Sequence, residues 1–312
     1  DLSQYKVKWR TPLIVPLAEQ RQLITAPPPS AGGVAIAQSL LMLQRLPWQQ
    51  AEPAQRAHYL AEVFRRAYRD RGLLGDPDFI DNPTQALLAR AHIVQLADSI
   101  QVDQATPSAS LAPSTEIHEG DHTTHFAVLD QQGNAVAATL SLNMMFGAAF
   151  TVPGTGVLLN DEMDDFAADL QGSNAYGLTG SAANAVQAGK RPLSSMSPSF
   201  LEGPNDFAAF GTPGGSRIPS MNVLSMLEYL NGQTPKQWVA TARVHHQYLP
   251  DVLGFEPGAL TLQQQQRLQK KGHTLEELTR NYGNQQVLLW QKKTGHSDAA
   301  SDPRGQGVSL SH

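Results

Sequence analysis

The segment from Thr123 to Thr139 constrains the fold of this 312-residue chain more than any other. It holds most of two short β-type runs, residues 124–129 and 135–142, and the residues Gln-Gln-Gly-Asn between them are typical of a hairpin turn. Residues 104–121, which precede it, are rich in Ser, Ala, Pro and Thr, so we expect an exposed linker there. The chain therefore passes at residue 123 from a linker into a sheet.

Helices are expected to dominate the first 120 residues, whereas strands and helices are mixed after the hairpin. The expected helices span residues 34–46, 55–71, 84–100, 221–231, 236–244 and 262–271. Two further strands are expected at residues 207–210 and 286–290. Strand pairs followed by helices indicate a layered α+β domain.

Composition excludes several classes of site and partner. A net charge of -5 without a basic stripe gives no reason to expect nucleic acid or an anionic membrane as partner, and no apolar run is long enough to span a membrane. The absence of cysteine excludes disulfides, thiolate catalysis and cysteine metal sites. A zinc site on His122, His125, His245 and His246 is not expected either, because the adjacent pair His245 and His246 would point in different directions on a helix. We expect neither a metal nor another cofactor.

Seven short segments are weak signals singly but specific as an ordered set. They are Pro-Pro-Pro-Ser-Ala-Gly-Gly (27–33), Gly-Asp-Pro-Asp-Phe (75–79), the run 123–139, Leu-Leu-Asn-Asp-Glu-Met-Asp-Asp-Phe (158–166), Lys-Arg-Pro-Leu-Ser-Ser-Met-Ser-Pro (190–198), Gly-Thr-Pro-Gly-Gly-Ser-Arg (211–217) and Ala-Ser-Asp-Pro-Arg (300–304). Over nearly the whole chain they resemble the γ-glutamyltransferase (γ-glutamyltranspeptidase) family of N-terminal nucleophile hydrolases.

This resemblance implies a fold and a maturation pathway. The fold would be the four-layer αββα arrangement, and a zymogen would cleave itself between His122 and Thr123. Residues 1–122 would then be the C-terminal part of a large subunit, mostly helical and ending in the linker. Residues 123–312 would be the whole small, catalytic subunit, and the two would form a heterodimer.

The chemistry of Thr123 fits such a cleavage. A threonine hydroxyl is a poor nucleophile at neutral pH, but a free α-amino group has an unperturbed pKa near 8 and can serve as its general base. While the chain is continuous, the Thr123 nitrogen is an amide and has no basicity. Cleavage would therefore supply the missing base, and one hydroxyl would serve both maturation and catalysis. Ser141, where the family usually has threonine, would hydrogen-bond this nucleophile.

Four carboxylates lie within residues 161–165, a pattern that is ordinarily a solvated acidic loop. The segment lacks the alternating oxygen ligands and the central glycine of a calcium loop, so it is a poor metal site. By resemblance, Glu162 and Asp165 would bind the α-amino group of a γ-glutamyl substrate, with help from Asn143. A cationic amine needs such an anionic partner in a desolvated pocket.

Two further pairs gain a role from the resemblance. Ser194 and Ser195 lie between prolines and would otherwise form only a turn; in the family these serines bind the substrate α-carboxylate. Gly214 and Gly215 would otherwise form a flexible turn, but two glycines after a strand can direct backbone N–H groups at a developing oxyanion. The Gly-rich loop lacks the Lys-Ser/Thr of a phosphate-binding loop.

Two expectations concern the edges of the site. The glycine-rich stretch 169–180, with Tyr176, resembles a lid over the pocket, although an ordinary surface loop would look the same. In the family an arginine far upstream pairs with the substrate α-carboxylate, and no counterpart segment is present here. The chain is thus expected to be a fragment or a divergent short form, and in the latter case Arg191 or Arg217 would take over this role.

The sequence therefore predicts a γ-glutamyltransferase or glutathione hydrolase, acting through a γ-glutamyl-threonine intermediate. Donors would be glutathione and related γ-glutamyl compounds, and acceptors water, an amino acid or a dipeptide. The alternatives are a glutaryl or cephalosporin-type acylase of the same superfamily, and an inactive fragment that cannot complete the pocket. By resemblance alone, the location would be periplasmic or secreted.

Overall fold

The computed structural model describes residues 2–111, 122–167 and 181–310, and its central element is a six-stranded sheet. The strand order is β1-β2-β5-β6-β10-β11, and every neighbouring pair is antiparallel. Their bounds are Leu13–Pro16 (β1), Gln22–Thr25 (β2), Ser199–Glu202 (β5), Asp206–Gly211 (β6), Gln286–Gln291 (β10) and Ser297–Ser301 (β11). The N-terminal strands β1 and β2 thus join a sheet built otherwise from the second part of the chain.

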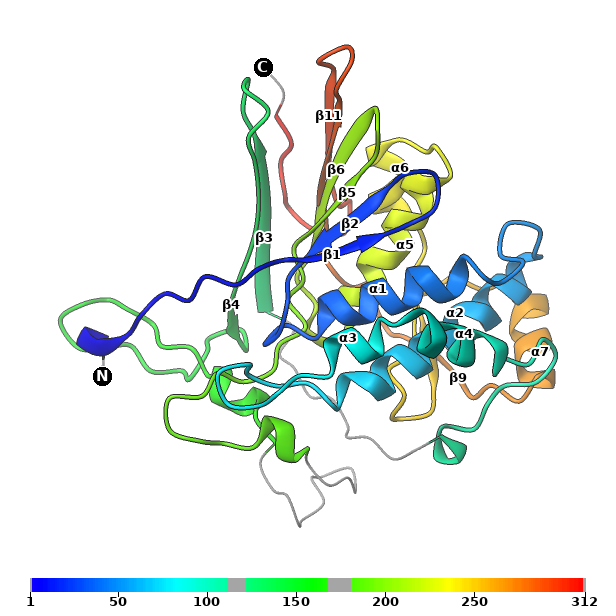
Figure 1. Ribbon diagram of the computed structural model, residues 1–312, viewed down its shortest axis with the longest axis horizontal. Helices are drawn as coiled ribbons and strands as arrows, with labels where there is room; N and C mark the ends of the chain where they lie inside the picture. Colours follow the sequence, from blue (N-terminus) through cyan, green and yellow to red (C-terminus); the bar gives the residue numbers. More distant parts are fainter. Residues whose placement is uncertain (1, 112–121, 168–180, 311–312) are drawn as a thin grey trace.

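Helices form a layer beside this sheet (Figure 1). Helix α5 (Ile218–Leu230) contacts β6, α6 (Pro235–Ala240) contacts β10 and β11, and α1 (Gly32–Leu43) packs between α5 and α2 (Pro53–Arg71). The core between sheet and helices is apolar and aromatic: the Phe210 ring lies 5.4 Å from Trp238 and 6.0 Å from Tyr229. Burial of such large aromatic surfaces is the main stabilisation of this interface.

A separate hairpin lies beside the sheet. Strands β3 (His122–Leu129) and β4 (Ala135–Asn143) pair only with each other, but both contact β6 and β3 also contacts β10 (Figure 1). The contact is close, since a Cβ atom at Gly211 would lie 2.1 Å from the His125 ring, which only glycine avoids. The outward side chains Phe126, Val128, Val136 and Leu140 are 46–54% exposed.

The remaining elements complete an α+β fold. A three-stranded sheet comprises β7 (Val244–His245), β8 (Leu253–Phe255) and β9 (Leu275–Glu277), next to α7 (Leu262–Lys270). The other elements are α3 (Thr84–Leu87), α4 (Arg90–Asp98) and five 3-10 turns, η1 (Leu2–Gln4), η2 (Ser108–Ser110), η3 (Glu162–Asp165), η4 (Ala182–Asn184) and η5 (Gly215–Arg217). Of the four expected layers, the described residues supply one helical layer, the six-stranded sheet and the β3-β4 hairpin beside it. No helix of the described residues is long and apolar enough to cross a membrane.

Most predicted elements are confirmed, and the errors have local causes. The strands β1, β2, β5, β8, β9 and β11, each of three to five residues, were not predicted. The helix predicted over 84–100 is two helices, since Ala89 takes an extended conformation with ψ 138°. The helix predicted over 236–244 ends at Ala240, and Val244 and His245 form a strand. The two adjacent histidines are therefore not on a helix.

The predicted linker is anchored where it begins. The Ala105 amide donates to Lys271 O, the Thr106 hydroxyl donates to Glu62, and the Ser108 amide donates to Asp251. Ala105 and Ser108 are buried, so the expectation of an exposed linker is wrong for this part. The chain is held there because its polar groups bond the buried Glu62 on α2, the Lys271 carbonyl and Asp251. Residues 112–121 lie outside the described residues.

Candidate functional site

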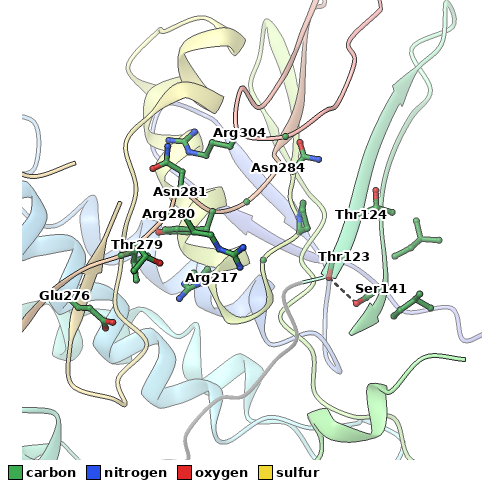
Figure 2. A pocket seen from close by; sticks show the side chains of 18 of the residues that line it. Thr123, Thr124, Ser141, Arg217, Glu276, Thr279, Arg280, Asn281, Asn284 and Arg304 are labelled. Carbon is green, nitrogen blue, oxygen red and sulfur yellow. Dashed lines mark hydrogen bonds between the residues drawn. The ribbon is translucent and has the colours of Figure 1, made fainter. Parts of the chain in front are cut away.

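Thr123 lies at the start of β3, opposite Ser141 on β4 (Figure 2). Its Oγ1 donates a hydrogen bond to Ser141 Oγ over 3.1 Å, and the same serine oxygen accepts from the Asn143 amide over 2.8 Å. The strand register shifts between His122 and Thr123, and Asn143 has a positive φ of 69°. A β-bulge with Leu142 as the extra residue on β4 thus lies opposite the peptide bond that the sequence marks for cleavage, in line with the frequent use of bulges beside active sites.

The turn between β6 and α5 carries Gly214 and Gly215, both buried and both with positive φ, at 138° and 53°. A side chain at Gly214 would also meet Met221, whose Cε lies 2.5 Å from the position of a Cβ atom. None of the hydrogen bonds within the described residues is donated by the backbone amide of either glycine. Buried N–H groups without an acceptor are costly, and in an oxyanion hole they await a ligand.

A cavity of about 930 Å³ lies between the Thr123 end of the hairpin and the turn that carries Gly214. Its walls are the hairpin, the glycine turn and a loop that follows β9 (Figure 2). The lining residues are Thr123, Thr124, Leu140, Ser141, Leu142, Pro213, Gly214, Arg217, residues 276–284, Arg304 and Gly305. Thr123, Ser141 and Gly214 therefore meet at one cavity, whereas Gly215 does not line it.

The other predicted binding residues lie beyond the end of β4 rather than in this cavity. The Asn143 side chain donates to Asp161 O over 3.4 Å, and the Asp161 amide donates to Leu142 O over 3.2 Å, so η3 is attached to the end of the strand. Glu162 Oε1 is buried and accepts no hydrogen bond from the described residues.

Asn184 connects Asp165 to the serine pair. Its Nδ2 donates to Asp165 O over 2.7 Å, and its Oδ1 accepts from the Leu193 amide over 2.9 Å. The segment after Leu193 is extended, so Ser194 is half-buried and Ser195 is fully buried. Asn143, the acidic turn and the serine pair thus form a connected group beyond the end of β4, and none of them lines the cavity.

Two predicted residues have no described side-chain position. His122 contributes its backbone to β3, and nothing further of its side chain is described. Tyr176 lies outside the described residues, as does most of the predicted lid.

Comparison with known proteins places this geometry in a family. The sequence model of γ-glutamyltranspeptidase matches residues 1–311. The glutathione hydrolase proenzyme of Pseudomonas aeruginosa is 41% identical over 99% of this chain and 56% of its own length. The chain belongs to the γ-glutamyltranspeptidase family.

Solved structures agree on the fold. A γ-glutamyltranspeptidase from Pseudomonas nitroreducens, complexed with L-DON, is 42% identical over 61% of this chain and 99% of its own, with a TM-score of 0.55. A cephalosporin acylase from Bacillus halodurans covers 97% of this chain and 53% of its own with a TM-score of 0.81, but at 21% identity it shows the fold alone. The fold is that of the N-terminal nucleophile hydrolases. This chain spans about half the length of the curated γ-glutamyltranspeptidase relatives it matches.

The family motif Ala-Ser-Asp-Pro-Arg holds the cavity loop in place. Asp302 pairs with Arg243 and accepts from the Gln285 amide, while Arg304 pairs with Glu256 over 2.7 Å. Arg243 also donates to Tyr282 O, and the Tyr282 amide donates to Glu256. These buried ion pairs fix the loop that forms one wall of the cavity, which is a role that the sequence did not suggest.

The two arginines proposed as substitutes for the family's upstream arginine differ in position. Arg217 lines the cavity, with its guanidinium 4.9 Å from the centre of the Tyr282 ring. Arg191 does not line it; its Nη2 donates to Lys6 O over 3.0 Å, and its guanidinium lies over Tyr5. Of these two, only Arg217 can meet a ligand in the cavity.

One group of side chains in the described residues has the spacing of a metal site, away from Thr123. It comprises His58, Glu62 and His273, all buried. Glu62 is already occupied, because Arg65, Arg66 and Thr106 all donate to its oxygens. His58 Nδ1 and His273 Nε2 are 2.7 Å apart, which is a hydrogen bond between the two rings. The cluster is accounted for as a buried polar network.

His125 is buried on β3, two residues after Thr123. It shares the inward face of β3 with Thr123, and its Nδ1 lies 2.8 Å from the Thr139 hydroxyl. Burial disfavours the charged imidazolium and lowers the pKa of His125 to about 4. The imidazole next to Thr123 is therefore neutral at physiological pH.

Sequence reasoning missed the loop of residues 276–284. In sequence it is a polar stretch between a short strand and β10, and nothing in it differs from an ordinary surface loop. Its Arg280, Asn281 and Asn284 line the cavity (Figure 2). The loop is held there by the bonds of the Tyr282 backbone to Arg243 and Glu256.

Proposed function

We propose that this protein transfers or hydrolyses γ-glutamyl groups, with Thr123 as the nucleophile after the chain is cut before it. The observation that carries this proposal is the meeting of Thr123, Ser141 and Gly214 at one cavity. Acyl transfer requires a nucleophile, a group that orients it and N–H donors for the oxyanion. Thr123, Ser141 and the buried Gly214 amide match these requirements.

Cleavage comes first. Thr123 Oγ attacks the carbonyl carbon of His122, the peptide C–N bond breaks, and the acyl group moves to the hydroxyl oxygen as an ester. Water hydrolyses the ester, which leaves a carboxylate on His122 and a free α-amino group on Thr123. The β-bulge at this bond and the hydrogen bond from Thr123 to Ser141 support this step.

Turnover then uses the new amino group as the base. Thr123 Oγ attacks the γ-carbonyl carbon of the donor while its proton passes to the α-amino group, and the oxyanion is stabilised by the Gly214 and Gly215 amides. The γ-amide C–N bond breaks, and the proton goes to the departing amine. Water or an acceptor amine attacks the γ-glutamyl ester, and the hydroxyl of Thr123 is regenerated. No cofactor takes part.

The γ-glutamyl head would bind beyond the end of β4. Glu162 and Asp165 would hold its α-ammonium group with Asn143, and Ser194 and Ser195 its α-carboxylate. The buried Glu162 Oε1, which lacks a donor among the described residues, supports a cationic ligand there. This feature favours γ-glutamyl over glutaryl substrates, because a glutaryl group has no amine.

Two substrates separate the candidates. Turnover of γ-glutamyl-p-nitroanilide with no turnover of glutaryl-p-nitroanilide is the expected result. Equal rates with both would show a side-chain acylase instead. No turnover of either would identify an inactive relative.

The subunit organisation is part of the same proposal. Residues 123–312 make up about 61% of the sequence, which is the share of this chain that the Pseudomonas nitroreducens chain covers. This supports residues 1–122 as part of a large subunit and residues 123–312 as the small subunit of a heterodimer. A periplasmic or secreted location is proposed from the family resemblance alone.

A further inference from the structure

Thr123 lines the large cavity, whereas the residues proposed for the γ-glutamyl head lie outside it, beyond the end of β4. Neither the acidic turn η3 nor the serine pair lines the cavity, whereas Thr123 does. A γ-amide substrate has two halves, which meet at the carbonyl carbon that Thr123 attacks. If the γ-glutamyl half binds beyond the end of β4, outside the cavity, the cavity beside Thr123 is left for the other half. Its volume of about 930 Å³ is ample for a small peptide.

The cavity offers one cation with no partner in the described part of the chain. Among its three arginines, Arg304 is paired with Glu256 and Asp302, and Arg217 stacks on Tyr282. Arg280 is exposed, and neither a hydrogen bond nor an ion pair links it to another described residue. Two carboxylates, Glu276 and Glu277, also line the cavity, and Glu277 accepts from the Gly258 amide.

Arg280 lies on a loop that is fixed on both sides of it. Before it, the Leu278 amide donates to Phe255 O over 2.9 Å. After it, Tyr282 is held by Arg243 and Glu256, and the Asn284 amide donates to Thr212 Oγ1 over 3.3 Å. In Figure 2 the Arg280 side chain extends from this loop into the cavity, towards the side on which Thr123 lies. A cation on a fixed backbone can act as a binding group with little loss of loop entropy.

We propose that the cavity binds the peptide half of the substrates and that Arg280 binds its terminal carboxylate. The ligand is a dipeptide, either as the leaving group of the donor or as the acceptor of the γ-glutamyl group. Its amine lies at Thr123 and its carboxylate at Arg280. This inference rests on the proposed γ-glutamyl transfer and adds the recognition of the second half of the substrate.

The kinetic test compares substrates with and without that carboxylate. In Arg280→Gln, kcat/KM for glutathione should fall about tenfold relative to kcat/KM for γ-glutamyl-p-nitroanilide, whose leaving group has no carboxylate. The acceptor preference for glycylglycine over glycylglycine amide should fall by a similar factor. Arg267→Gln, an exposed arginine on α7 that does not line the cavity, should leave both ratios as they are.

A binding measurement separates this inference from the proposed function. Glycylglycine and its amide are titrated into the unmutated protein in the absence of a γ-glutamyl donor, followed by calorimetry or NMR, so that no turnover occurs. Preferential binding of the dipeptide acid that Arg280→Gln abolishes and Arg280→Lys partly retains supports the inference. Equal binding of acid and amide, or a preference that survives in Arg280→Gln, overturns it. Failure of the unmutated protein to cleave γ-glutamyl-p-nitroanilide would overturn the proposed function instead.

Discussion

Thr123 donates its hydroxyl hydrogen to Ser141, 3.1 Å away on the opposite strand of the hairpin. Ser141 accepts a second hydrogen bond from the Asn143 amide, so its oxygen is fixed by the end of its own strand. The hydroxyl of the proposed nucleophile is thus oriented by a neighbour that is itself held in place. In the continuous chain the Thr123 nitrogen is an amide and is not basic. The Thr123 hydroxyl is therefore oriented before cleavage would create the α-amino base.

Removing the Ser141 hydroxyl should slow turnover. In Ser141→Ala, Thr123 loses its acceptor and the Asn143 amide loses its partner, and we expect kcat to fall about tenfold to a hundredfold. Ser141→Thr keeps the hydroxyl and should retain most activity. Steady-state rates with γ-glutamyl-p-nitroanilide measure both; equal rates for Ser141→Ala and the unmutated protein would show that this hydrogen bond is not used.

The glycine turn should tolerate no side chain. Gly214→Ala places a Cβ atom 2.5 Å from Met221 Cε at a φ of 138°, so the turn must shift. The Gly214 and Gly215 N–H groups would then no longer point at the oxyanion. A loss of about a hundredfold or more in kcat is expected, as for removal of one oxyanion donor. Gly232→Ala is the matched control, because Gly232 also has positive φ, 74°, but nothing lies within 4 Å of its Cβ position. A comparable activity loss in both variants would point to general destabilisation.

The acidic turn should select for the substrate amine. Asp165→Asn should cost roughly 2 to 4 kcal/mol of transition-state binding with γ-glutamyl donors, because the ammonium loses its charged partner. Cleavage before Thr123 should continue, since it involves no ammonium ligand. Asp164→Asn, at the exposed neighbouring position, is the control. If donors without the α-amino group react as fast as γ-glutamyl donors, the amine pocket is wrongly assigned.

Acid should destabilise the protein through its buried histidines. The pKa of His125 falls to about 4 in the folded chain from its ordinary 6.5, because burial disfavours the charged ring, and burial lowers the pKa of His246 to about 4 as well. The unfolded chain therefore binds more protons between about pH 6.5 and pH 4, and stability is lost as the pH falls through this window. Each such histidine contributes about 1.4 kcal/mol per pH unit.

His125→Gln tests this contribution. Its free energy of unfolding should depend less steeply on pH than that of the unmutated protein between pH 6.5 and pH 4. The difference in slope should correspond to about one proton fewer taken up on unfolding. Denaturant titrations at several pH values give this slope. An unchanged slope would mean that His125 titrates normally in the folded state.

The sequence could predict the hairpin but not the cavity beside it. Alternating residues on both sides of Gln-Gln-Gly-Asn determine β3 and β4 locally, and the pairing of Thr123 with Ser141 follows from that register. Strands β1 and β2 escaped prediction because four residues carry too little periodicity, and they are stabilised by pairing with the distant β5. The position of Arg280 depends on Arg243, Glu256 and Asp302, which come together only in the folded chain. No local pattern reports such long-range ion pairs.

If Thr123 becomes an N-terminal nucleophile, an intact-mass measurement under denaturing conditions will detect both the cut chain and the γ-glutamyl group on Thr123. The unmutated protein should give two fragments, a smaller one that ends at His122 and a larger one that begins at Thr123. The fragment with Thr123 should gain one γ-glutamyl group after brief exposure to a donor. Thr123→Ala should stay uncut and unlabelled, and Thr123→Ser should be cut and labelled more slowly. Cleavage of the Thr123→Ala protein at the same bond, or a γ-glutamyl group attached to any other residue, would contradict the account.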